Sequence, residues 1–150
     1  MALLELKGFN SNQFKKFHPG GNLGKDLKKI SEIMHIGKSL PLAKETDKMN
    51  KTLITMTKKS FGCVGVINKK QKLVGIITDG DLRRHMNEEL LTLLVNDVMT
   101  KNPSSIRPNA LAAEALGIMN DLKITSLFVA ESGSLKGIVH IHDCLRAGVA

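Results

Sequence analysis

The chain has 150 residues, 42% of them hydrophobic and 24% charged, and a net charge of +8 at pH 7. These values are ordinary for a globular protein and allow a real core, in one domain or in two small ones. The positive charge favours an anionic partner. With five Phe and no Trp or Tyr, however, the chain lacks a stacking platform for bases, which argues against single-stranded nucleic acid.

The N-terminus has no apolar run of signal-peptide or membrane-spanning length, so we expect a cytoplasmic protein with no membrane partner. Cys63 and Cys144 form no CxxC or other metal spacing and are expected to be buried, reduced thiols. His140, His142 and Cys144 together could hold zinc. Strand geometry separates the histidines from Cys144, so structural or solvent-facing roles are favoured and no metal site is predicted.

Residues 1–29 carry six lysines against two acidic residues, a basic stretch whose simplest interpretation is a solvated face. The pattern predicts the end of a helix at 3–6, an irregular loop at 18–24 and a short helix at 25–30. The segment has too few apolar residues to fold alone, so it looks like the tail of a larger domain.

From residue 30 onward one pattern occurs twice. Each copy opens with a polar cap and an apolar pair, at 31–35 and at 96–100, followed by an extended piece at 39–43 or 104–107. An amphipathic helix comes next in each copy. We expect Thr46 or Asp47 to cap the first and Asn109 the second. The shared apolar faces are formed by Met49, Leu53 and Met56 and by Leu111, Ala115 and Ile118.

Two strands joined by a turn follow, at 63–67 and 73–77 in the first copy and at 126–130 and 135–139 in the second. Each copy ends on a polar turn into a helix, which begins near Leu82 in the first. Segments 75–84 and 137–146 are sixty-two residues apart (137−75=62) and in register, which indicates an internal repeat. Each three-stranded sheet has an apolar face that it cannot cover alone. The copies should therefore pack sheet to sheet about a pseudo-twofold axis, in an α/β (α+β) fold.

Thr78 and Asp81 lie at the turn between the last strand and helix of the first copy. There a hydroxyl and a carboxylate can face one small ligand, and an ionised carboxylate can accept two hydrogen bonds from a vicinal diol. The positive end of the helix adds attraction for anionic groups. Alternatively, Asp81 and Asp143 are only N-terminal helix carboxylates, a role that stabilises a helix by roughly 0.3–1 kcal/mol.

The Gly-h-x-h-Thr-x-x-Asp pattern at 75–81, its weaker echo at 137–143 and the repeated Ile33-Met34 and Val98-Met99 pairs resemble tandem cystathionine-β-synthase (CBS) domains. The resemblance implies clefts between paired sheets that bind nucleotides, often adenosine derivatives. Residues matching Asp81 hold ribose hydroxyls in the family, and those matching Thr78 sit beside ribose or phosphate. Asp79 belongs to the same turn.

Sequence position places four cations where they could neutralise a phosphate or a sugar carboxylate: Arg83, Arg84, Lys38 and Lys44. The second copy has His140 in place of the Ser or Thr and keeps Asp143. We therefore expect unequal clefts, with the one around Thr78 and Asp81 binding more tightly.

Over the whole chain, the order of Phe17-His18-Pro19-Gly20-Gly21, the run 78–84, Asp97-Val98-Met99-Thr100 and the run 142–148 is similar to the C-terminal part of bacterial D-arabinose-5-phosphate isomerases. These enzymes join a SIS (sugar isomerase) domain to a CBS pair and convert ribulose 5-phosphate to arabinose 5-phosphate for synthesis of Kdo, an acid of lipopolysaccharide and some capsules. The resemblance implies a SIS remnant and linker at 1–29 and CBS domains at 30–93 and 94–150. His18 then matches an active-site histidine.

The expected function is regulatory, with the SIS domain of the same full-length chain as partner and a homodimer through the CBS pairs. No cofactor is required, and the regulatory ligand is expected to be CMP-Kdo or an adenine nucleotide. This chain alone should not isomerise sugars, because the other catalytic groups belong to the SIS domain. Two alternatives remain open: a structural dimerisation module without a ligand, and a basic nucleic-acid adaptor.

Overall fold

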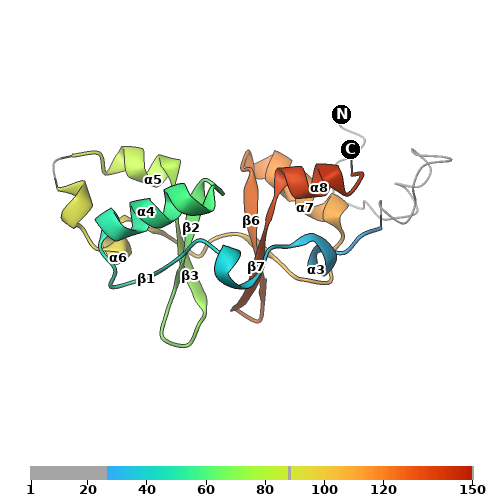
Figure 1. Ribbon diagram of the computed structural model, residues 1–150, viewed down its shortest axis with the longest axis horizontal. Helices are drawn as coiled ribbons and strands as arrows, with labels where there is room; N and C mark the ends of the chain where they lie inside the picture. The colour runs from blue at the N-terminus through green and yellow to red at the C-terminus, as the bar shows by residue number, and fades with distance from the viewer. Residues whose placement is uncertain (1–26, 88, 150) are drawn as a thin grey trace.

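The computed structural model describes residues 27–87 and 89–149, which form two lobes side by side (Figure 1). The sheet of the first lobe has the order β1-β2-β3-β4, formed by β1 (Leu42–Lys44), β2 (Cys63–Ile67), β3 (Leu73–Thr78) and β4 (Thr100–Lys101). The sheet of the second lobe has the order β5-β6-β7, formed by β5 (Ser105–Ile106), β6 (Ser126–Glu131) and β7 (Ser134–His140). In each lobe the first pair of strands is parallel and the next is antiparallel. The predicted α/β repeat is confirmed, with β4 as an additional strand.

The helices lie on the outer sides of the two sheets (Figure 1): α4 (Met49–Lys59) and α5 (Asp79–Arg84) beside the first sheet, and α7 (Ala112–Leu122) and α8 (Ile141–Arg146) beside the second. Helix α5 begins three residues before the predicted start at Leu82, because the Thr78 side chain caps it. The predicted helix at 25–30 is wrong for residues 27–29, where the backbone makes a turn and a β-bridge. Short helical turns complete the fold at α3 (Ile30–Ile33), η2 (Gly37–Ser39), η3 (Leu90–Thr92) and α6 (Val95–Val98).

The predicted caps of the two long helices are wrong. The N-caps are Lys48 and Leu111, and neither side chain caps its helix. The first helical N–H groups are satisfied by distant backbone instead: Met49 N donates to Leu93 O at 2.9 Å, and Ala112 N donates to Lys28 O at 2.8 Å. A backbone carbonyl from another segment thus replaces a side-chain cap.

The lead-in segments of the two repeats cross to the opposite lobes. Helix α3 packs into the second lobe, where Ile30 belongs to the same buried cluster as Leu127 and Val139. Helix α6 packs into the first lobe, where Val95 and Val98 join the buried cluster around Met49, Val64 and Ile77. Figure 1 shows α3 beside β7 and α6 beside α4 and β1. The predicted domain limits 30–93 and 94–150 therefore describe the two repeats in the sequence. In space, each lobe is completed by a segment of the other repeat.

The two sheets meet through a third buried cluster centred on Cys63, Phe128 and Ile138, to which both lobes contribute. Gly65 leaves room for this contact, because a Cβ there would lie 2.7 Å from Phe128 Cζ. The sheets thus pack against each other as predicted. Among residues 27–87 and 89–149, no helix combines the length and apolarity needed to cross a bilayer.

Candidate functional site

A cleft of about 510 Å³ lies between the lobes, within the size range of small-molecule sites. The first lobe contributes the starts of β2 and α5, and the second lobe contributes the segment 122–126 that leads into β6. Its apolar walls include Phe61, Ile76, Ile124 and Phe128, and its polar groups include Thr78, Thr100, Asn102, Thr125 and Ser126. Among the described lining residues, Lys123 is the cation and Asp79 the acid.

Thr78 and Asp81 face each other at one wall of this cleft. Thr78 N donates to Asp81 Oδ2 at 2.8 Å and Thr78 Oγ1 donates to the same oxygen at 3.0 Å. Asp81 N in turn donates to Thr78 Oγ1 at 3.4 Å. This reciprocal arrangement is a capping box, which satisfies the first N–H groups of α5 and fixes the turn. Thr78 lines the cleft, whereas Asp81 is 2% exposed and lies behind the lining.

The second carboxylate oxygen of Asp81 is held by two more donors. Arg84 Nη2 and Thr100 Oγ1 each lie 2.5 Å from Oδ1. Burial by itself raises the pKa of Asp81, but the hydrogen bonds from Thr100, Thr78 and Arg84 together outweigh it and hold the pKa below the ordinary value. Asp81 is therefore an ionised, fully hydrogen-bonded carboxylate.

Thr100 reaches Asp81 because Gly75 lets β4 approach β3 closely. Thr100 and Lys101 pair with Ile76 and Gly75. A Cβ at Gly75 would collide with Met99 Sδ and lie 3.2 Å from the Thr100 carbonyl oxygen. The same arrangement recurs at Gly137, where a Cβ would lie 2.6 Å from the His35 carbonyl oxygen and 2.8 Å from Met34 Sδ. The paired Gly and Met residues of the repeat thus bring one lead-in side chain to each carboxylate.

Asp143 occupies the equivalent position in the second lobe, in a different setting. It accepts hydrogen bonds from His140 N at 2.8 Å, from His35 Nε2 at 2.9 Å and from Arg146. His140 caps α8 through Nδ1, which accepts from His142 N at 3.1 Å. Asp143 lines a smaller hollow of about 280 Å³ together with Lys28, Ile33, Arg146 and Ala147.

Four rings follow one another next to this second carboxylate, which the first of them contacts, and we call them the ring cluster: His35, Phe61, His140 and His142. The centroids of His35 and Phe61 are 5.1 Å apart, those of Phe61 and His140 6.4 Å, and those of the stacked His140 and His142 4.8 Å. Burial lowers the pKa of His140, and the neighbouring His142 lowers it further, against an opposing effect of Asp143. The neutral imidazole is the form that can cap the helix, because Nδ1 must accept a hydrogen bond.

Of the predicted site residues, Thr78 and Asp79 line the cleft, and Asp81 and Arg84 lie directly behind Thr78. Arg83 pairs with Asp79 at 2.7 Å on the exposed face of α5. Lys38 lies in η2, outside the cleft lining, and its carbonyl oxygen accepts from Lys59 Nζ. His140 and Asp143 lie at the second carboxylate. His18 lies outside the described residues.

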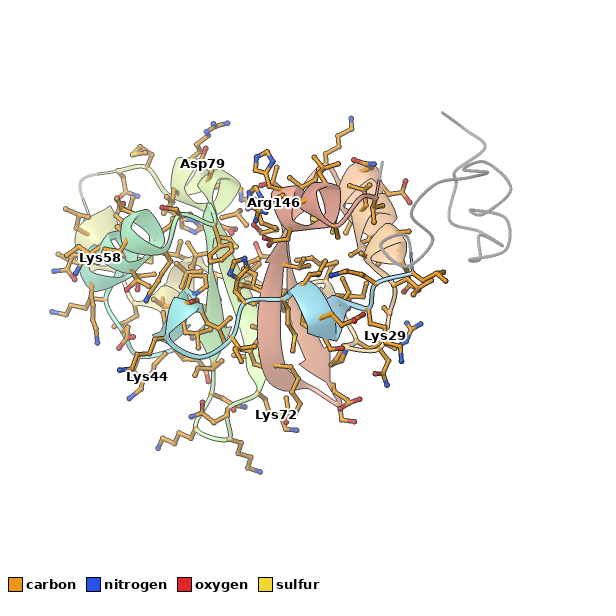
Figure 2. All side chains as sticks on the ribbon, turned by 45° about the vertical axis from the view of Figure 1, so that its right-hand side comes forward. Lys29, Lys44, Lys58, Lys72, Asp79 and Arg146 are labelled. Atoms are coloured by element: carbon orange, nitrogen blue, oxygen red, sulfur yellow. The ribbon has the colours of Figure 1, made fainter. Side chains whose placement is uncertain are left out.

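The suggested role of Lys44 beside the ligand is wrong. Lys44 pairs with Ile67 at the end of β2 opposite to Cys63, the residue that pairs with Thr78. Figure 2 shows Lys44 and Asp79 at opposite edges of the molecule. Parallel pairing of β1 with β2 carries Lys44 away from the turn, which sequence position alone does not reveal.

Sequence reasoning missed Thr100 and His35. They stand at equivalent positions of the two repeats, each directly after the apolar pair that ends in Met99 or Met34. A polar residue in that register in both copies was the available signal. Which carboxylate each of these two residues contacts depends on the crossing of the lead-in segments between the lobes.

Both cysteines are buried as predicted, and burial raises the pKa of Cys63 to about 12 and that of Cys144 to about 11. Within the described ranges, no three His, Cys, Asp or Glu side chains are grouped so as to hold a metal ion.

Two curated relatives match almost the whole chain. The uncharacterized protein RP505 of Rickettsia prowazekii is 42% identical over 146 residues, 97% of this chain and 46% of that protein. The arabinose 5-phosphate isomerase KdsD of Escherichia coli K12 is 41% identical over 152 residues, 99% of this chain and 46% of that enzyme. The chain thus spans about half the length of the curated relatives it matches.

Solved structures with the same fold include CBSX2 in complex with AMP, with a TM-score of 0.69 and 23% identity over 80% of this chain and 95% of that chain. The CBS domains of a transcriptional regulator from Streptococcus pneumoniae give a TM-score of 0.71 at 20% identity, covering 81% of this chain and 99% of that chain. The CBS domain family itself matches residues 30–88 and 95–150. The chain therefore belongs to the CBS domain family, of which it carries a tandem pair.

Proposed function

We propose that this CBS pair is a regulatory module that binds a nucleotide or nucleotide sugar in the cleft beside Thr78 and Asp81. The carrying observation is an ionised carboxylate directly behind the wall of a 510 Å³ cleft whose other walls are largely apolar. The carboxylate suits the vicinal hydroxyls of a ribose, and the walls formed by Phe61, Ile76 and Phe128 suit a base. The CBSX2 structure in complex with AMP supports a nucleotide as the ligand class.

The charge around the cleft favours a ligand with few phosphates. Lys123 lines the cleft and Arg84 lies next to Gly80, which also lines it. These two cations match a monophosphate, as in AMP, or a phosphate and a carboxylate, as in CMP-Kdo. A triphosphate would leave negative charge unpaired. We therefore rank AMP and CMP-Kdo before ATP as ligands.

The enzyme regulated would be an arabinose-5-phosphate isomerase, as the similarity to KdsD suggests. Residues 28–30, at the N-terminal side of the pair, are the segment that would couple ligand binding to the enzyme. Ile30 N donates to Ala110 O and Ala112 N donates to Lys28 O, so residues 28–30 are fastened to the start of α7 in the second lobe. A ligand that shifts one lobe against the other would move this segment, and regulation needs only about 1–3 kcal/mol of difference between the two states.

The test is a calorimetric titration of the 150-residue chain with AMP, CMP, ATP and CMP-Kdo. We expect binding of AMP or CMP-Kdo, and a loss of at least about tenfold in affinity for Asp81→Asn, because the neutral amide offers one acceptor oxygen instead of two. The matched control, Asp143→Asn, should bind like wild type. Equal losses in both variants, or no binding by wild type, would contradict the proposal.

A second proposed function, compatible with the first, is dimerisation with another copy of the chain. Large apolar side chains stand exposed on or next to three of the helices: Ile54 is 58% exposed on α4, Met86 68% after α5, and Leu145 48% on α8. Burying such residues against a second copy would release ordered water. Light scattering after size exclusion should give a dimer for wild type and for the control Gln71→Glu, in the exposed turn between β2 and β3, and a monomer for Ile54→Glu. A wild-type monomer at all accessible concentrations would end this proposal.

A further inference from the structure

Asp81 has no free position for a ligand in the structure. A carboxylate offers roughly four lone-pair sites. Thr78 N and Thr78 Oγ1 fill those of Oδ2, and Arg84 and Thr100 fill those of Oδ1. A ribose hydroxyl can therefore donate to Asp81 only when one of these four donors leaves.

The four donors are not equally replaceable. The two from Thr78 belong to the capping box, so their loss would undo the start of α5. Arg84 and Thr100 have exposed side chains that water can satisfy after release. Of these two residues, Thr100 lines the cleft together with Thr78, whereas Arg84 is not part of the lining. A ligand in the cleft therefore meets the hydroxyl of Thr100 on its way to Asp81.

We propose that Thr100 is a positioning residue of the nucleotide site, whose hydroxyl occupies on Asp81 the place that a ligand hydroxyl takes. Capture of the ligand exchanges one hydrogen bond for another and releases Thr100. This inference rests on the proposed nucleotide binding at the same cleft. It adds a residue from the sequence of the second repeat to the site of the first.

The release of Thr100 has a mechanical consequence. Thr100 and Lys101 form all of β4, which is held to β3 by two residue pairs and by Asn102 N donating to Val74 O at 3.3 Å. The chain then runs through Pro103 and Ser104, both in the cleft lining, into β5 of the second lobe. Loosening Thr100 frees the connector between the two lobes, so occupation of the cleft is coupled to their relative position.

The experiment compares Thr100→Val, which keeps the shape and removes the hydroxyl, with Thr100→Ser, which keeps the hydroxyl. We expect Thr100→Val to bind AMP about tenfold more tightly than wild type, since the ligand no longer competes with a hydrogen bond to a charged group. Thr100→Ser should stay within about twofold of wild type. Hydrogen exchange of the Asn102 amide should quicken on AMP addition in wild type and be unaffected by AMP in Thr100→Val.

A ligand-free measurement separates this inference from the proposed function. In the free chain, the carboxyl carbon resonance of Asp81 should titrate at higher pH in Thr100→Val than in wild type or Thr100→Ser. An unchanged titration, or AMP binding by Thr100→Val that is no tighter than that of wild type, overturns the role of Thr100. If wild type binds AMP and Thr100→Val binds it equally well, the proposed replacement of the Thr100 hydrogen bond by a ligand hydroxyl is contradicted, and the proposed nucleotide binding stands. If wild type binds no nucleotide, the proposed function fails and the exchange with it.

Discussion

Asp81 and Asp143 occupy equivalent backbone positions in the two repeats, but different side chains surround them. Each accepts from the backbone N–H of its helix cap, from an Arg three residues later and from a lead-in residue that has crossed from the other repeat. The first has two hydroxyl partners, Thr78 and Thr100, beside an open cleft. The second has one imidazole partner, His35, and a second imidazole, that of His140, next to it in the ring cluster. Hydroxyls keep one protonation state across physiological pH and imidazoles do not. The two equivalent carboxylates thus differ in their side-chain partners, which are hydroxyls at Asp81 and include an imidazole that can respond to pH at Asp143.

The largest effect expected from breaking the shared backbone arrangement is at Gly137, with Gly75 as its comparison. Gly137→Ala should destabilise the chain by about 3 kcal/mol, because the new Cβ meets the backbone oxygen of His35, which is fixed by its pairing with Ile138. Gly75→Ala should cost about 1 kcal/mol, since its closest neighbour is the flexible end of Met99. Urea unfolding of both variants measures the difference. A larger loss for Gly75→Ala would show that the first lobe is the tighter one.

A smaller effect is expected at the cap of α5. Thr78→Ala removes the side chain that both caps the helix and bonds Asp81, and should cost about 1–2 kcal/mol. Thr78→Ser retains the hydroxyl and should lie within about 0.5 kcal/mol of wild type. Chemical denaturation at pH 7 tests this pair. Equal stability of the Ala and Ser variants would mean that the capping box contributes nothing.

The smallest effect should be a pH dependence, and it sharpens the contrast between the halves. The pKa of His140 is lowered in the folded chain, by burial first, so the unfolded chain binds the proton more readily. Stability should therefore fall as the pH drops below about 6.5, the unfolded value for histidine, and level off below the folded pKa. The groups that set this response are His35, His142, Asp143 and Arg146, which all act on His140.

Thermal unfolding between pH 8 and pH 5 measures this dependence. In His140→Asn an amide oxygen can cap α8 at any pH, so the decline should be shallower than in wild type. The Asp81 carboxyl gives a separate decline at lower pH, because its pKa is also lowered and stability is lost as pH falls through the folded value. An identical profile for His140→Asn and wild type would place the pH response elsewhere.

Much of the fold could be read from the sequence because it is local. The strands at 63–67 and 73–77 were recognisable from short apolar runs, and β2 and β3 begin at the predicted residues. The capping box of Thr78 and Asp81 was recognisable as a hydroxyl and a carboxylate three residues apart, a spacing that a helix start brings together. Asp81 lies in the first turn of α5, as the alternative of an N-terminal helix carboxylate predicts, and nucleotide binding by Thr78 and Asp81 stays a prediction.

The tertiary structure alone decided which segments complete the two carboxylate sites. Asp81 and Thr100 are 19 residues apart, and Asp143 and His35 are 108 apart. Each pair meets only because the lead-ins cross between lobes and close glycine contacts hold them there. The same crossing supplied backbone carbonyls to α4 and α7, which is why the predicted side-chain caps were not used. Local spacing determines which groups a turn presents. Long-range packing determines which of them remain free for a ligand.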